Sequence, residues 1–103
     1  MIYDYLDEFI VNSISNYEIE QYENEAIEQV SKLGIEDDFF IKRLVVSRVY
    51  ILAARSQFEA DGMEAKHKIY TQEYKDALNE SLLLKKDGIK NKNKVFSVPL
   101  GRG

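Results

Sequence analysis

The sequence predicts an all-α fold, a small antiparallel bundle of about four helices followed by an extended C-terminal arm. Three observations support this prediction. Proline occurs only at Pro99, so no earlier segment is interrupted by a proline ring. Gly34, Gly62 and Gly88 divide the chain into segments of helical length. Within those segments apolar residues recur at spacings of three and four, which is typical of helices buried along one side.

The first two expected helices lie on either side of the polar stretch Asn12 to Asn16. The first, about Tyr3 to Val11, is short, and a helix of that length is marginal unless it packs against something. The second begins near Ser15, because Ser15 and Glu18 fit the capping-box pattern Ser-x-x-Glu. Its stripe contains Ile19, Tyr22, Ala26, Val30 and Leu33, and its wet face contains Glu18, Glu20, Glu23, Asn24, Glu25 and Glu28. Gly34 follows, where a residue of positive φ commonly ends a helix.

The third expected helix begins near the acidic run Glu36 to Asp38, which suits the positive end of a helix dipole. The sequence FFIKRLVVSRVYILAARSQF that follows is apolar on nearly every side, so we expect neighbours around it. Its run of β-branched residues is also typical of a strand, but the length of the segment and its regularly placed basic residues favour a helix. Arg43, Arg48 and Arg55 need acidic partners in such a helix. Those partners are either glutamates of the second helix or groups of a neighbouring subunit, and the sequence does not decide between them.

The fourth expected helix runs from about Met63 to Leu84, and Gly88 and the run Lys90 to Lys94 are expected to end it. Its buried face is expected to contain Met63, Tyr70, Tyr74, Ala77, Leu78 and Leu82. The predicted core centres on Leu44, Val45, Val49, Leu52, Tyr70, Tyr74 and Leu78. The chain is thus divided into a helical domain, 1–84, and a basic extended arm, 85–103.

Charge separates these two parts sharply. Residues 1–84 carry eight basic and seventeen acidic side chains, a net charge of −9, whereas residues 85–103 carry six basic side chains and one acid. A compact acidic body cannot pair well with such an arm within one monomer. The imbalance therefore indicates an arm that acts on another molecule, in assembly rather than catalysis.

Composition argues against an enzyme. The chain has no cysteine and one histidine, His67, so thiol chemistry and histidine metal sites are excluded. The acids Glu36 to Asp38 lack the spacing of a calcium loop, and no glycine-rich phosphate loop is present. The tyrosines fall mainly at core positions, which favours packing over base stacking. We expect no metal, no cofactor and no membrane span, because the apolar runs are too short.

The arm contains the hexapeptide VFSVPL, in which Phe96, Val98 and Leu100 alternate with Val95, Ser97 and Pro99. This alternation is typical of a strand added to the edge of another protein's sheet. The neighbouring lysines would steer it to an acidic surface. A frayed terminus is the alternative. The predicted partner-binding residues, for a portal protein or a neighbouring subunit, are Lys90, Lys92, Lys94, Val95, Phe96, Ser97, Val98, Pro99, Leu100 and Arg102.

The stretch Phe39 to Leu82 resembles the head–tail connector (adaptor or head completion) proteins of tailed bacteriophages. The shared features are an apolar helix of the KRLVVSRVYILAA kind, a break at Phe58 to Gly62, and a last helix containing Y…EYKDAL. The resemblance implies a homo-oligomeric ring, dodecameric in the family, that docks on the portal protein by its C-terminal arm. A tail or stopper protein would bind below, and DNA would pass through without sequence-specific binding. The protein would be assembled in the host cytoplasm and reside at the head–tail interface of the virion.

Two other classes of function remain open besides the connector. One is a small phage- or prophage-encoded regulatory module that binds an acidic host protein through its basic arm. The other is a nucleic-acid binder that uses KKDGIKNKNK on phosphates, although the net charge of −4 opposes such binding by the body. Catalysis is the least favoured class.

Overall fold

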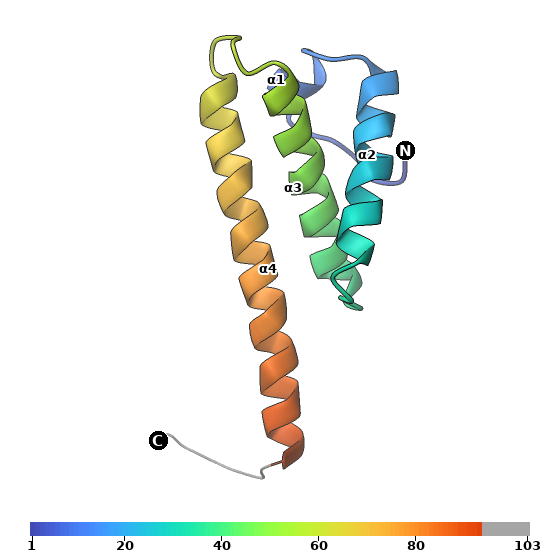
Figure 1. Cartoon of the computed structure of the whole chain (residues 1–103), viewed down its shortest axis with the longest axis vertical. Coiled ribbons are helices and arrows are strands. Elements are labelled where there is room, and N and C mark those ends of the chain that lie inside the picture. The colour runs from blue at the N-terminus through green and yellow to red at the C-terminus, as the bar shows by residue number, and fades with distance from the viewer. Residues whose placement is uncertain (94–103) are drawn as a thin grey trace.

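The chain folds into α1 (Glu8–Val11), α2 (Asn16–Ser31), α3 (Asp38–Ser56) and α4 (Met63–Asn93) (Figure 1). This computed structural model describes residues 1–93, and residues 85–93 by their backbone alone. No strand occurs among the described residues. The predicted all-α class with about four helices is confirmed.

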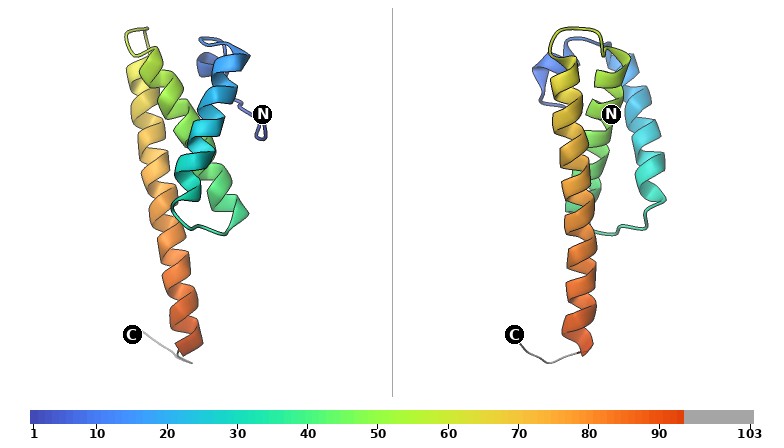
Figure 2. Two further views of the ribbon diagram at one scale, coloured as in Figure 1. Left: turned by 45° about the vertical axis from the view of Figure 1, so that its right-hand side comes forward. Right: turned by 60° about the vertical axis from the view of Figure 1, so that its left-hand side comes forward.

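Helix α3 is the centre of the bundle. It packs against α2 on one side and α4 on the other, and α2, α3 and α4 run alternately up and down (Figures 1 and 2). Helix α1 lies at the end where α3 turns into α4, and the N-terminal segment leads to it from beside the middle of α2. Helix α4 has 31 residues, about 46 Å at the usual rise, and it projects well past the opposite end of the bundle.

The predicted starts of the second and third helices are confirmed by their caps. The Ser15 side chain accepts from the backbone N–H of Glu18, and Glu18 reciprocates to Ser15, which forms the complete capping box. At α3 the Asp37 carboxylate accepts from the N–H of Phe39 at 2.8 Å and of Phe40 at 3.3 Å. Gly34, with φ of +70°, turns the chain between α2 and α3.

Two apolar clusters make the core. One lies between α2, α3 and α4, and the other joins α1 to the adjoining ends of α3 and α4. Their buried members are Ile19, Ala26, Val30, Leu44, Val45, Val49 and Ala77 in the first, and Ile10, Tyr50, Ala53, Ala54 and Met63 in the second. Of the predicted centre, Leu44, Val45 and Val49 are buried; Leu52, Tyr70, Tyr74 and Leu78 are half-buried.

The predicted start of the first helix was wrong. No helix precedes Glu8, because partners elsewhere in the fold take the backbone N–H groups of this segment. Glu23 of α2 accepts from Ile2 and Tyr3, and the Tyr50 hydroxyl of α3 accepts from Asp7. Residues 1–7 therefore run along the bundle without forming a helix.

The predicted end of the fourth helix was wrong as well. Helix α4 continues through Gly88 to Asn93, nine residues beyond Leu84. One interior glycine costs a helix only about 1 kcal/mol relative to alanine, and no proline stops the chain before Pro99. Residues 85–93, the first nine of the predicted arm, therefore belong to α4. Leu82, expected on the buried face, is instead 54% exposed.

Candidate interaction surfaces

The predicted partner-binding residues fall in two places. Lys90 and Lys92 lie on the last turns of α4. Lys94, Val95, Phe96, Ser97, Val98, Pro99, Leu100 and Arg102 lie outside the described residues. Strand addition by the VFSVPL segment therefore remains a prediction, and the surfaces described below come from the body and from the projecting helix.

The projecting part of α4 begins with three exposed leucines. Leu82, Leu83 and Leu84 are 54, 58 and 53% exposed. Consecutive helical residues point about 100° apart, so these three side chains spread over more than half of the helix circumference. Clustered exposed apolar residues of this kind mark a surface that another molecule covers.

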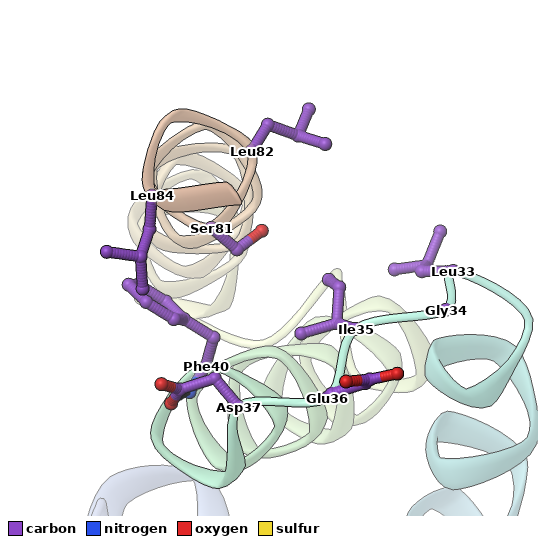
Figure 3. Close-up of a pocket in the computed structure, with 9 residues that line it drawn as sticks. All are labelled: Leu33, Gly34, Ile35, Glu36, Asp37, Phe40, Ser81, Leu82 and Leu84. Atoms are coloured by element: carbon purple, nitrogen blue, oxygen red, sulfur yellow. Dashed lines mark hydrogen bonds between the residues drawn. The ribbon is translucent and has the colours of Figure 1, made fainter. Parts of the chain in front are cut away.

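A groove lies beside these leucines, between α4 and the turn that joins α2 to α3 (Figure 3). Its volume is about 260 Å³. Leu84 points toward Phe40 at one side, while Leu33 and Leu82 stand on the opposite rims. Apolar side chains from three elements therefore line a depression that is the size of one or two side chains.

Acidic residues border this groove. Glu36 and Asp37 line it, and Asp38 follows directly at the start of α3. All three are exposed, and no ion pair within residues 1–84 involves them. Asp37 is also the N-cap of α3, so its carboxylate is fixed by two backbone N–H groups. The groove thus combines an apolar lining with a negative rim.

A second, larger groove runs between α3 and α4 beneath the N-terminal segment. Its volume is about 600 Å³, and it is open to solvent. Leu6, Phe39 and Ile69 line it and are 83, 63 and 56% exposed. Exposure of this degree is unusual for three apolar side chains around one depression. The surface is suited to contact with a protein neighbour.

Arg43 fastens α3 to α4 at the edge of the second groove. Its Nε lies 2.9 Å from Oε2 of Glu73, and its Nη1 lies 2.8 Å from Oε1 of Glu80. These hydrogen bonds raise the pKa of the guanidinium, which is charged in any case. Arg48 donates from Nε to Oε1 of Gln29 on α2 at 2.6 Å. The partner of Arg43 is therefore within the chain, but on α4 instead of the second helix.

Sequence reasoning missed Glu23, which was expected on the wet face of α2 and is only 2% exposed. Its carboxylate accepts from the N–H of Ile2 and Tyr3 and from the Tyr5 hydroxyl, at 2.8, 3.1 and 2.6 Å. Burial alone would raise the pKa of Glu23, but these hydrogen bonds outweigh burial and lower it. No spacing rule reveals this role, because the partners are backbone groups some twenty residues away.

Asp7 makes the second attachment of the N-terminal segment. Its Oδ2 accepts from Lys66 Nζ at 2.9 Å and from the Tyr70 hydroxyl, both on α4. Burial opposes ionisation of Asp7, yet the hydrogen bonds from Lys66, Tyr70 and the N–H of Ile10 hold its pKa below the ordinary value. Burial and the bond to Asp7 raise the pKa of Tyr70. Asp7, Lys66 and Tyr70 thus fix the N-terminal segment to α4.

His67 is half-buried and packs edge-on against Phe58, with ring centroids 5.6 Å apart. No group of three metal-ligating side chains gathers within the part of the chain that the structure describes. Among the described residues, no helix is long and apolar enough to cross a bilayer.

Comparison with known proteins does not assign the chain to a group. No family model, no curated protein and no solved structure matches it. The likeness to phage connectors therefore rests on the sequence features of Phe39 to Leu82 alone.

Proposed function

We propose that this protein is a structural head–tail connector of a tailed bacteriophage. In this role, copies of the chain form a ring that docks on the portal protein through the C-terminal arm and continues the DNA channel toward the tail. The observation that carries the proposal is the length of α4. This helix projects past the end of the bundle, so Lys90 and Lys92 of the basic arm lie on a part of α4 that extends beyond the acidic body, where a partner would reach them.

The charge distribution supports a channel-forming body. Residues 1–84 have a net charge of −9, the same sign as DNA. A basic channel wall would bind phosphates along its length, whereas a wall of like sign lets the DNA pass. Repulsion of this kind acts over about 8 Å at physiological ionic strength, so it matters near the wall.

The exposed apolar surfaces support assembly into a ring. Leu6, Phe39 and Ile69 around the α3–α4 groove would lose their contact with water if a neighbouring copy packed there. Burial of apolar surface contributes about 25 cal/mol per Å². The twelvefold copy number comes from the family resemblance alone, and a measured mass of the ring would fix it.

The arm would supply the attachment to the head. Its predicted strand would pair with a sheet edge of the portal, where Phe96, Val98 and Leu100 enter apolar pockets and the lysines meet acidic groups. The protein is expected to act without catalysis and without a cofactor in this role. A tail or stopper protein would bind the other side of the ring.

The direct test is to combine the purified chain with DNA-filled heads that carry the portal encoded beside its gene. Electron microscopy should then show an added ring of density beneath the portal vertex, absent from heads incubated without the chain. A chain that leaves these heads unchanged, but binds a host protein tightly, would instead support the regulatory-module alternative.

A further inference from the structure

We propose that the groove between the α2–α3 turn and α4 is a binding site for the C-terminal segment Lys94–Arg102 of a second copy of this chain. The proposal begins with the groove itself, which is apolar inside and acidic at its rim (Figure 3). It goes beyond the proposed function and does not depend on it, because it concerns contact between copies of the free protein.

The size of the groove favours a peptide side chain over a small molecule. Small-molecule sites usually measure about 300–1,000 Å³ and enclose their ligand. This groove measures about 260 Å³ and is bounded by Phe40, Leu84 and the Leu33–Ile35 turn. One or two apolar anchors of a peptide would fill it, and the rest of that peptide would lie across the rims.

Charge identifies a peptide of matching chemistry. Glu36 and Asp37 place two acids at the groove, Asp38 follows them directly in the chain, and none of the three forms an ion pair within residues 1–84. The C-terminal segment offers Phe96, Val98 and Leu100 as anchors, with Lys94 before them and Arg102 after them. An apolar segment with basic residues at both ends thus matches an apolar groove with an acidic edge.

The reach of the chain favours a second copy for the first anchor, Phe96. Helix α4 carries Asn93 about 13 Å beyond Leu84 and about 18 Å beyond Ser81, at the usual rise per residue. Three residues from Asn93 to Phe96 span at most about 11 Å, and reversing the direction of the chain takes a turn of about four residues. The Phe96 of the same chain therefore cannot return to the groove, whereas that of another copy can enter it without a reversal.

Each copy would then donate one segment and accept another. Such head-to-tail contacts form closed rings when the rotation between copies closes, and open chains when it does not. One segment cannot occupy a neighbour's groove and a portal pocket together. Docking on a head would therefore displace the segment from the groove, and the groove contact belongs to the protein before it docks.

Photocrosslinking of the full-length chain tests this inference. A chain with p-benzoylphenylalanine in place of Phe96 is irradiated with an excess of wild-type chain labelled with ¹⁵N, and the crosslinked peptides are sequenced by mass spectrometry. We expect crosslinks to labelled peptides from Leu33–Phe40 and Ser81–Leu84. The same probe in place of Tyr17, which is exposed on α2, should give none in the groove.

Charge reversal supplies the specificity control. Glu36→Lys combined with Asp38→Lys should reduce the groove crosslinks at least about fivefold, since the rim attraction is lost. Glu20→Lys with Glu28→Lys makes the same change in net charge on the exposed face of α2 and should leave the yield nearly unchanged. Circular dichroism would confirm that both double variants fold.

Three results would overturn the proposal: crosslinks confined to the unlabelled chain, crosslinks to labelled peptides outside the groove, or no crosslinks at all. Equal effects of the two charge reversals would also contradict it. None of these results bears on whether the chain joins heads, so a failure here is separate from a failure of the connector proposal.

Discussion

The Tyr5 hydroxyl donates a 2.6 Å hydrogen bond to Oε2 of Glu23 and so joins the N-terminal segment to the middle of α2. The same carboxylate also binds the backbone at Ile2 and Tyr3. Together with the hydrogen bonds from Lys66 and Tyr70 of α4 to Asp7, Glu23 fixes a segment that covers part of the core. This arrangement explains why Glu23, an acid expected on the wet face of α2, is buried.

Replacement of Glu23 by glutamine should destabilise the protein. The amide keeps the shape but loses the charge, and its NH₂ group cannot accept from the donors that face it. Loss of a charge-assisted buried contact usually costs about 1–3 kcal/mol. Urea unfolding at neutral pH should report this loss, whereas Glu28→Gln, exposed on the same helix, should change stability by less than about 0.5 kcal/mol.

Acid should destabilise the fold through the same carboxylates. The pKa values of Glu23 and Asp7 are lowered in the folded chain, so the unfolded chain binds more protons as the pH falls. The stabilisation is complete above the ordinary pKa values, about 4.3 for Glu and 3.9 for Asp, and is lost as the pH falls through the lower folded values. Unfolding curves from pH 7 to pH 3 should show this decline, with a smaller decline in Glu23→Gln. An equal decline in both proteins would contradict the role of Glu23.

Alanine should be tolerated less well at Gly62 than at Gly34. Both glycines have positive φ, +87° and +70°, where a side chain is strained by about 1–2 kcal/mol. A Cβ at Gly62 would also lie 2.9 Å from Cζ of Phe9, whereas nothing lies within 4 Å of one at Gly34. Thermal unfolding should therefore show a larger loss for Gly62→Ala. In a Phe9→Ala background, the two alanine substitutions should lower the thermal stability equally. If Gly62→Ala remained the more damaging change there, the contact with Phe9 would not be the cause.

A charge at the centre of α3 should prevent folding. Val49 is 1% exposed between α2 and α4, and Val49→Asp would bury a carboxylate without a partner. The penalty of several kcal/mol is comparable with the whole stability of a small domain, about 5–15 kcal/mol. Circular dichroism should show loss of helix for Val49→Asp but not for Lys42→Asp, which is exposed on the same helix. A well-folded Val49→Asp protein would show that this part of the core is misplaced.

Local patterns predicted the helices well, because caps and apolar spacing act over a few residues. Ser15 with Glu18 and the acids before Phe39 marked their helix starts correctly. The errors at the N-terminal segment, Glu23 and Leu82 involve contacts between distant parts of the chain, whereas the late end of α4 reflects the small cost of Gly88. Glu23 binds Ile2 and Tyr3, so its burial depends on where the N-terminus folds back. Leu82 has the spacing of a core residue, but whether a neighbour covers it depends on the relative lengths of α3 and α4. The acidic groove likewise forms only after the α2–α3 turn meets α4.

The central claim is that the C-terminal arm attaches this protein to the phage head, and deletion of Val95–Gly103 tests it most directly. The truncated chain should retain its helical body, seen by circular dichroism, and should fail to join portal-bearing heads in electron micrographs. Within the full chain, Phe96→Ala should weaken joining more than Lys92→Ala, because a desolvated aromatic anchor usually outweighs a charge at the rim. Normal joining of the truncated chain would contradict the claim.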